Sequence, residues 1–591
     1  MIVPMVKVSI YGFVKEKEQI LADLQEMGCL HLVPLKPPTE AGLGGGPSPG
    51  ARDALKFLLS CPQKRRQVKD PSKFDALAVE RQALDLQKRI LDLQDERDFL
   101  QGRIENLRLW GDFAFPPRED LGNYRLWFYI VPHNQMKDVE ETDLIWEVVR
   151  HDNRFSYVAV ISEKEPLGMP VQRTRTGDKP LSELEQRLDE VELELEDLEA
   201  ERSSLTRWCS LFARSLDRLE DTVARTEAAN MTYDDEPLFG LHAWALGENV
   251  DRLQEYASDK GLALEVEEPE PEETPPTLLR SPPTVAAAQN LVSFYMTPRY
   301  WLWDPSAIVF FAFAVFFAMI LADAGYSLVL GLGLALAWKG MGQTEMGRRF
   351  RILLTALVGA GVIYGALVGS YFGVVPGKDT FFGKLNIIHM ADFDVMMMLS
   401  IMTGVLHLIL ANAVTAWHRR HSVAAVEPAG WVFIFLGGVA IWLGVSGGEA
   451  MAFLETAGTA AIGLGVAAVL LFSSVEGPLW RRLLRGLQGL TRISSAFGDS
   501  LSYLRLFALG LASASLASTF NDLAGQVKAA LPAFGIFFAI LIVLLGHGLN
   551  FVLALTSGLI HGLRLNFIEF FKWSISEEGH PFKAFARKES E

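Results

Sequence analysis

Two apolar stretches near the C-terminus carry charged residues, GDSLSYLRLFALGLASASLASTF at 498–520 and GHGLNFVLALTSGLIHGLRLNFIEFF at 546–571. The first holds Arg505, with apolar residues for several turns on its C-terminal side. A guanidinium stays protonated at any accessible pH, and a charge inside a membrane costs roughly 2.5 to 3.5 kcal/mol on insertion scales. We therefore expect Arg505 to face a partner or a water-filled path.

A polar stripe runs along the second stretch. Steps of 3, 7, 4 and 3 residues separate its members, and Ala554 fills the gap, so they share one side of a helix: His547, Asn550, Ser557, His561 and Arg564. Such a stripe suits the wall of an ion path, because a permeating ion exchanges its water for side-chain partners. Alternatively, single polar residues bind neighbouring helices or reach the membrane surface. That alternative fits Ser557 or Asn550 alone better than the two arginines together.

These stretches also resemble a known family. The strings SYLRLFALGLA, GHGLNF and IHGLRLNFIEFF are similar to the C-terminal part of the membrane-embedded stator subunit of V-type and A-type rotary ATPases, called subunit a or subunit I. FFAMILADAGY around Asp323, IYGALVGSYFG around Gly369 and SIMTGVLHL around His407 occur in the family's order. In that family the arginine matching Arg505 faces the ion-carrying carboxylate of the rotor ring, and the arginine matching Arg564 supports it.

The resemblance and the polar stripe together predict the residues of ion translocation: Arg505, Arg564, His561, Ser557, Asn550, His547, Ser502, Asp499, Glu569 and Asp323. One position departs from the family. Many eukaryotic relatives carry a glutamate where this chain has Ala554, so an acid lining the path must come from elsewhere. The candidates are Asp499, Glu569, Asp323 and Glu476.

Composition separates the 591 residues into two unlike halves. The first 290 or so contain no apolar run long enough to cross a bilayer, whereas such runs dominate the remainder. The start, MIVPMVKVSIYGF, lacks the features of a signal peptide, so we expect the first half to stay in the cytoplasm. Three cysteines without a CxxC pair indicate neither disulfides nor a zinc site. The net charge of -16 argues against nucleic-acid binding.

The first half reads as two small α/β lobes on a rod. We expect a strand, helix and strand from Met5 to Leu35, with Gly28 ending the helix, and a glycine-rich loop at 40–50. Beyond the rod, YRLWFYIVP predicts a strand, DVEETDLIWEVVRHD a helix and FSYVAVISE a strand; PLFGLHAWAL, NVDRLQEYASDKG and LALEVEE then complete the first lobe.

Two heptad seams predict the rod. One is Val79, Ala83, Leu86, Ile90, Leu93, Arg97, Leu100, Ile104 and Leu107; the other is Leu181, Leu184, Leu188, Val191, Leu195, Leu198, Arg202, Leu205, Cys209 and Phe212. The simplest arrangement pairs them antiparallel. The predicted domains are a cytoplasmic part at 1–268 (lobe 1–73 with 227–268, coiled coil 74–112 and 180–226, distal lobe 113–179), a linker at 269–300 and a transmembrane domain at 301–591.

The second half predicts an α-helical membrane domain of about eight helices, the last two long and tilted. The apolar segments are 306–322, 325–338, 353–373, 395–416, 429–447, 457–474, 498–521 and 532–572, and the second is short for a full span. With a cytoplasmic N-terminus, the inner loops hold Lys339, Arg348, Arg349, Arg351, Arg419, Arg420, Arg481, Arg482, Arg485 and Arg492, and the outer loops only Lys378, Lys384 and Lys528. This bias satisfies the positive-inside rule and puts both termini in the cytoplasm.

No nucleotide, cofactor or metal site emerges from the sequence. FGVVPGKDT has the GK of a P-loop, but Asp379 follows Lys378 where Ser or Thr is required. We therefore expect no catalytic site in this chain and no direct nucleotide binding. The resemblance implies a multi-pass stator in the cell (inner) membrane that couples proton or sodium flow to rotation. Its implied partners are a proteolipid rotor ring, peripheral-stalk heterodimers and a central-stalk cap subunit.

Two other classes of protein remain open on the sequence. A membrane-anchored coiled-coil scaffold or signalling protein would tolerate neutralisation of Arg505. A secondary ion transporter usually shows an internal repeat, and none is visible between 306–447 and 457–572.

Overall fold

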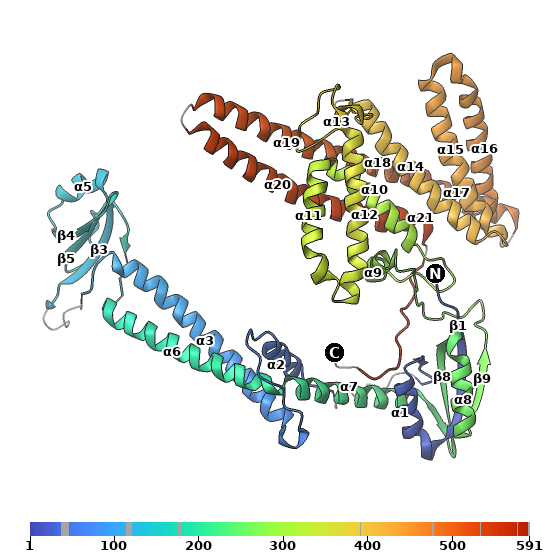
Figure 1. The fold of residues 1–591 in the computed structure, drawn as a ribbon, viewed down its shortest axis with the longest axis horizontal. Coiled ribbons are helices and arrows are strands. Elements are labelled where there is room, and N and C mark those ends of the chain that lie inside the picture. The colour runs from blue at the N-terminus through green and yellow to red at the C-terminus, as the bar shows by residue number, and fades with distance from the viewer. Residues whose placement is uncertain are drawn as a thin grey trace. The chain divides into compact units, whose positions relative to one another are not determined.

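The computed structural model describes residues 1–36, 46–113, 121–174, 176–177, 179–389, 392–474, 478–531, 534–575 and 577–588 (Figure 1). Most of the predicted glycine-rich loop and the candidate acid Glu476 lie outside the described residues. The chain forms two compact units. The first comprises Met1–Gly12, Cys29–Val33 and Gly240–Ala584; the second comprises Phe13–Gly28, Pro34–Phe239 and Phe585–Glu591.

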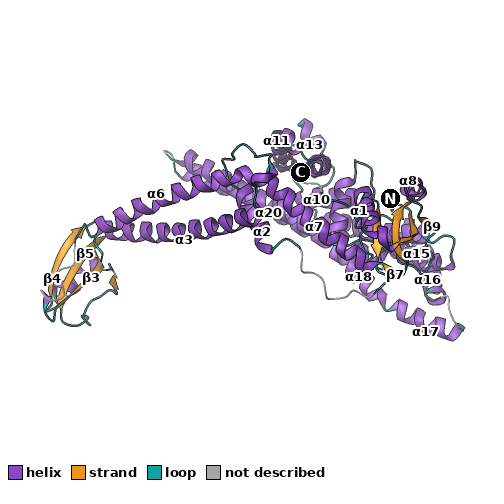
Figure 2. Ribbon diagram, turned by 90° about the horizontal axis from the view of Figure 1, so that it is seen from below, coloured by secondary structure: helices purple, strands orange, loops and turns teal. Residues whose placement is uncertain are grey.

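A pair of long helices forms the rod of the second unit. α3 (Ala76–Arg108) and α6 (Leu181–Leu205) lie side by side, and the apolar seam between them is buried (Figure 2). Arg187 pairs with Glu96 at 2.9 Å and Arg108 with Glu185 at 3.0 Å, so the C-terminal part of α3 meets the N-terminal part of α6. The two helices are therefore antiparallel.

The second seam is interrupted. A 3₁₀ turn at Thr206–Trp208 separates α6 from α7 (Cys209–Met231), where one continuous helix was predicted. The segment before α3 stabilises this turn, because the Arg65 amide donates to the Thr206 hydroxyl at 2.8 Å and the Gln67 side chain donates to the Thr206 carbonyl at 2.8 Å.

A helix that the sequence did not reveal, α2 (Pro49–Leu59), packs on the rod. Ser48 caps its start. Arg202, the polar interruption of the second seam, donates to the Phe57 carbonyl at 2.8 Å and to Ser60 Oγ at 2.9 Å. Its guanidinium also lies 4.1 Å from the centre of the Phe57 ring. The arginine thus sits in the seam because α2 supplies its partners.

The distal lobe is an antiparallel sheet of order β4-β5-β3-β6. Its elements are β3 (Arg125–Pro132), α5 (Met136–Glu140), β4 (Ile145–His151), β5 (Phe155–Ser162) and β6 (Arg173–Thr174). The helix predicted at 138–152 is wrong: only its first residues are helical, and β4 pairs with β5 from Ile145↔Ile161 to His151↔Ser156. Trp146 and the valines of β4 fit a pleated surface once a partner strand is present.

The other sheet has the order β2-β8-β1-β9, antiparallel at β2·β8 and β1·β9. The elements of this region are β1 (Met5–Phe13), α1 (Lys17–Met27), β2 (Leu30–Val33), β7 (Tyr233–Asp235), β8 (Leu238–Leu246), α8 (Val250–Lys260) and β9 (Ala263–Glu267). Gly28 ends α1 with a φ of 65°, as predicted for a left-handed cap.

Seven helices in the described part of the chain are long and apolar enough to cross a membrane, and α10 is a shorter apolar helix. The main helices are α10 (Ser306–Leu321), α11 (Ala324–Met341), α12 (Glu345–Val368), α14 (Phe393–His418), α15 (Val426–Ser446), α16 (Ala452–Phe472), α19 (Leu504–Ala530) and α20 (Gly535–Arg564). The short one is thus α10 with 16 residues and not the second segment, because Ala322 turns left-handed and Asp323 caps α11.

Shorter helices connect these spans: α9 (Ala286–Tyr295), α13 (Phe381–Lys384), α17 (Leu479–Leu490), α18 (Arg492–Ser502) and α21 (Phe571–Ser574). The range expected to be a linker therefore contains a helix, α9. It packs on α10 and α12 because its small, apolar face (Ala286, Ala287, Ala288 and Val292) is buried.

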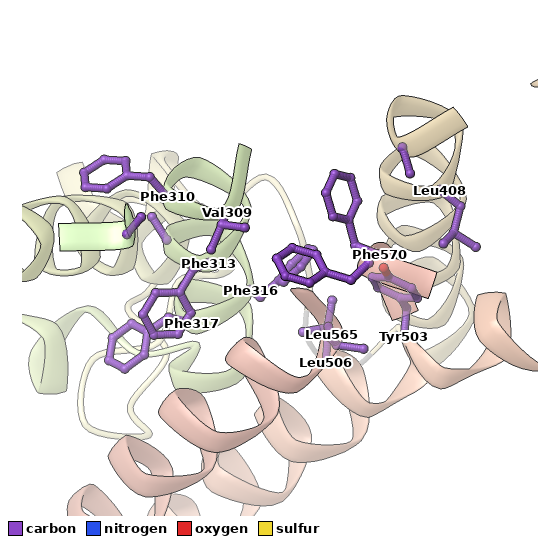
Figure 3. Packing of buried hydrophobic residues seen from close by; sticks show 14 of the residues in the cluster. Val309, Phe310, Phe313, Phe316, Phe317, Leu408, Tyr503, Leu506, Leu565 and Phe570 are labelled. Atoms are coloured by element: carbon purple, nitrogen blue, oxygen red, sulfur yellow. The ribbon is translucent and has the colours of Figure 1, made fainter. Parts of the chain in front are cut away.

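α10 lies at the centre of the membrane domain. It contacts α12, α19 and α20, and its side chains Val309, Phe310, Phe313, Phe316 and Phe317 are buried. These side chains belong to one buried cluster with Leu506, Leu565 and Phe570 of the C-terminal helices, and in Figure 3 the Phe310 ring points away from those three residues. The buried side of α10 thus holds α12, α19 and α20 in fixed positions, whereas Phe311 on its other side is 65 % exposed.

Candidate functional site

Arg505 lies at the start of α19, opposite a buried carboxylate. Its Nη1 is 3.9 Å from Oε1 of Glu569, within ion-pair distance but beyond the reach of a hydrogen bond. The Arg505 side chain is 24 % exposed and that of Glu569 is 4 % exposed. Arg505 Nη1 and Glu569 Oε2 are buried, and neither has a hydrogen-bond partner among the described residues. Arg505 and Glu569 are therefore close enough for electrostatic attraction but are not joined by a hydrogen bond.

Backbone irregularities on both helices create this arrangement. α18 ends at Ser502 and α19 begins at Leu504, so the helix breaks at Tyr503, two residues before Arg505. After α20 the chain continues as a π-helix, Leu565–Phe570, which contains Glu569. Single π-turns inside helices occur often at functional sites, because the extra residue shifts the side chains that follow.

Buried contacts hold the break at Tyr503 in place. The Tyr503 hydroxyl is 2.8 Å from Nδ1 of His407 on α14. The His407 ring stacks on Phe570, the residue after Glu569, with centroids 4.4 Å apart. One histidine thus joins the segment before Arg505 to the segment that carries Glu569, a positioning role that the sequence did not indicate.

Asp499 is engaged elsewhere. Its carboxylate accepts hydrogen bonds from Lys572 Nζ at 2.9 Å and from Trp573 Nε1 at 2.8 Å, which attaches α18 to α21. The nearby Ser502 hydroxyl donates to the Gly498 carbonyl of its own helix at 3.1 Å. Both residues lie near Arg505 in sequence, but their hydrogen bonds serve local structure.

His561 and Arg564 complete the polar group at this end of α20. Arg564 is exposed, and His561 is half-buried. The Nδ1 atom of His561 is buried and has no hydrogen-bond partner among the described residues. Arg505 and Arg564 both lie within electrostatic range of His561 and of Glu569. We call Arg505, His561, Arg564 and Glu569 the arginine cluster.

A second polar group lies toward the other end of the same helix pair. His547 on α20 contacts the Tyr326 hydroxyl through Nδ1 at 2.7 Å and the Asn521 side-chain oxygen through Nε2 at 3.0 Å. Asn550 donates to the same Tyr326 hydroxyl at 3.0 Å and to the Ser513 carbonyl at 2.8 Å. We call Tyr326, Asn521, His547 and Asn550 the histidine cluster. Only its two stripe members were predicted.

Asp323 caps a helix beside the histidine cluster. It is 3 % exposed and accepts four hydrogen bonds: from the Tyr326 amide, the Ser370 hydroxyl and the amides of Phe372 and Gly373. The structure therefore joins the start of α11 to the loop after α12 through this carboxylate. A role of Asp323 in ion movement stays a prediction.

The two clusters are well separated along the helices. Asn521 follows Arg505 by 16 residues on α19, which corresponds to about 24 Å of helix. Between them on α20, Ala554 is buried and Ser557 is half-buried. The predicted polar stripe therefore does not share one environment: Asn550 and Ala554 are buried inside the helix bundle, whereas Arg564 is exposed.

Comparisons with known proteins bear on this arrangement. No protein-family model matches the chain. It is 26 % identical to a V-type ATP synthase subunit I of Chlamydia pneumoniae, over 85 % of this chain and 84 % of the relative. It is 24 % identical to a V-type ATP synthase subunit I of Borreliella burgdorferi, over 96 % of each chain. An A-type ATP synthase subunit I of Methanocaldococcus jannaschii is 27 % identical over 67 % of this chain and 63 % of the relative.

A solved structure gives a weaker match. The crystal structure of the cytoplasmic N-terminal domain of subunit I, homologue of subunit a of V-ATPase, covers 44 % of this chain and 99 % of its own, with 18 % identity and a TM-score of 0.24. The sequence matches confirm the resemblance on which the site residues were predicted: the chain is similar to V-type and A-type ATP synthase subunit I over most of its length.

Proposed function

We propose that the chain is the stator of a rotary ATPase membrane sector, in which Arg505 faces the ion-carrying carboxylates of a proteolipid ring. The observation that carries the proposal is the loose pair of Arg505 with Glu569. The Arg505 guanidinium has no close hydrogen-bonded partner for Nη1 among the described residues and is still 24 % exposed, so it can attract an external carboxylate. An opposite charge within about 4 to 6 Å lowers a carboxyl pKa by 1 to 3 units, so Arg505 favours release of the bound ion.

The two polar clusters provide the ends of two separate half-channels. The half-channels open to opposite sides of the membrane, with the histidine cluster on the side away from the cytoplasm and both termini in the cytoplasm, and Arg505 lies between them. The fixed charge of Arg505 repels a cation that would pass directly from one to the other. Ion flow therefore requires that the ring carries the ion around, and this couples translocation of protons or sodium ions to rotation.

The cytoplasmic part anchors the static elements of the complex. Its two lobes and antiparallel rod bind the peripheral-stalk heterodimers, and the central-stalk cap subunit completes the rotor. A rod of two long helices suits this role, because α3 with 33 residues is about 50 Å long and ion pairs join its C-terminal part to α6.

The test is ion transport by the complex in liposomes with Arg505→Ala, checked for assembly by native gel. Arg420→Ala is the matched control, since Arg420 is exposed beside Trp417 on a loop. We expect transport to be lost in Arg505→Ala with the complex intact, and retained in Arg420→Ala. Transport near the wild-type rate in Arg505→Ala would favour a scaffold. Transport by the chain without a ring would identify a secondary transporter.

A further inference from the structure

The short helix α17 has three different faces. Helical spacing of 100° per residue puts Trp480, Leu483, Leu484 and Leu487 on one arc, Arg481 and Arg485 on a second and Gly486 and Gly489 on a third. We call these the apolar, basic and glycine faces. The glycine face and the basic face both contact α16 or the residues just after it, whereas the apolar face is exposed.

The glycine face holds α17 against the end of a membrane span. A Cβ added to Gly486 would lie 2.2 Å from the Leu470 carbonyl oxygen, so the two backbones are in direct contact there. A Cβ added to Gly489 would lie 2.8 Å from the Ser473 hydroxyl oxygen, so this glycine packs against a side chain at the end of α16. Leu470 belongs to the last turn of α16, a helix long enough to cross the bilayer. α17 is therefore fixed at the level where α16 leaves the membrane.

The apolar face is uncovered by the described part of this chain. Trp480 is 59 % exposed, Leu484 58 % and Leu487 59 %. Four large apolar side chains on one side of a 12-residue helix, at the end of a membrane span, match an interfacial amphipathic helix. In such a helix the apolar side chains enter the acyl region, and tryptophan favours the headgroup level.

The basic face lies beside the apolar face on the helix. Arg481 stacks over the Trp480 ring with its guanidinium 5.2 Å from the ring centre. Arg485 donates to Ser474 Oγ at 2.6 Å, which fixes it beside the end of α16. Guanidinium groups bind phosphate with paired hydrogen bonds, and each basic residue near an anionic membrane surface adds to the attraction.

We propose that α17 lies in the membrane surface and that Arg481 and Arg485 bind the phosphate headgroups of anionic phospholipids. The site takes phosphatidylglycerol-like lipids in preference to zwitterionic ones. It attaches the α15, α16 and α17 segment to the bilayer at a point separate from both polar clusters. This lipid site depends only on α16 spanning the membrane and does not depend on ion translocation by the chain.

The test uses a fluorescent label on α17 in the full chain, assembled in its complex and reconstituted into nanodiscs. The native cysteines Cys29, Cys61 and Cys209 are buried, so a bimane attached to Leu484→Cys reports on the apolar face, and one attached to Gln343→Cys, exposed on the turn between α11 and α12, reports on an aqueous position. We expect brominated lipid to quench the first label and aqueous iodide to quench the second. Iodide quenching at position 484, or protection from both quenchers by a partner protein, would overturn the proposal.

Lipid preference is measured with the same label. Brominated phosphatidylglycerol should quench the Leu484→Cys label more strongly than brominated phosphatidylcholine at equal mole fraction, with about fivefold local enrichment per arginine at low salt. Arg481→Gln with Arg485→Gln should remove this preference. The control pair Arg348→Gln with Arg420→Gln, exposed arginines in the first turn of α12 and on the turn after α14, should leave it unchanged. Equal quenching by the two lipids in the unmodified helix would refute headgroup selection.

Discussion

The hydrogen bonds that Asp323 accepts allow us to predict how much a substitution there destabilises the loop after α12. Oδ1 of Asp323 accepts from the amides of Tyr326 and Phe372, each at 3.0 Å. Oδ2 accepts from the Ser370 hydroxyl at 2.7 Å and from the Gly373 amide at 3.0 Å. In Asp323→Asn one oxygen becomes an NH₂ group of nearly the same shape. The Ser370 hydroxyl can rotate to accept from it, but the Gly373 amide then faces a second donor.

The free-energy cost is the sum of two effects. A buried donor left without an acceptor costs about 1 to 3 kcal/mol, and each of the three remaining bonds loses about 1 kcal/mol because residue 323 no longer carries a charge. We therefore expect the loop after α12 to open about 4 to 6 kcal/mol more easily in Asp323→Asn. Since 1.36 kcal/mol is a factor of ten, that change corresponds to about a thousandfold or more in the opening equilibrium.

Hydrogen exchange measures this opening directly. In the detergent-solubilised chain, the peptide containing Phe372 and Gly373 should lose its protection in Asp323→Asn. Exchange should be unchanged in Asp394→Asn, which alters an exposed carboxylate at the start of α14. If the protection at Phe372 and Gly373 changes by less than about tenfold, the four bonds do not hold the loop and the energies above are wrong.

Two further predictions concern other carboxylates. Glu569→Gln removes the negative charge of the side chain that faces Arg505. We expect ion transport in liposomes to fall about tenfold, equivalent to about 1.4 kcal/mol of barrier, with assembly intact. An unchanged rate would mean that Glu569 does not position the arginine. At the C-terminal tail, the hydrogen bond from Lys588, with Arg52, holds the pKa of Glu220 below its ordinary value. This tail contact therefore adds stability at neutral pH, and that stability is lost as the pH falls through the folded-state pKa of Glu220. Hydrogen exchange of the tail, corrected for intrinsic rates, should then be faster in acid. In Glu220→Gln the exchange should be faster at neutral pH as well.

Much of this protein is determined by its sequence alone, where the signal is local and periodic. Long apolar runs define the membrane helices, and a 3.5-residue repeat defines the rod, because burial of one continuous face stabilises such helices. Gly28 ends α1 because only a left-handed residue fits there. Arg505 and the polar stripe of α20 were evident because charges inside apolar runs are costly.

Only the tertiary structure decides which distant groups meet. Residues 145–151 form a strand because β5 offers a partner, although the acidic residues before them resemble a helix start. Glu569 reaches Arg505 through a π-turn, and Asn521 joins His547 from another helix. The cap made by Asp323 depends on a loop some 50 residues away. Such contacts join groups far apart in the chain, and their energies depend on packing that no local pattern of residues contains.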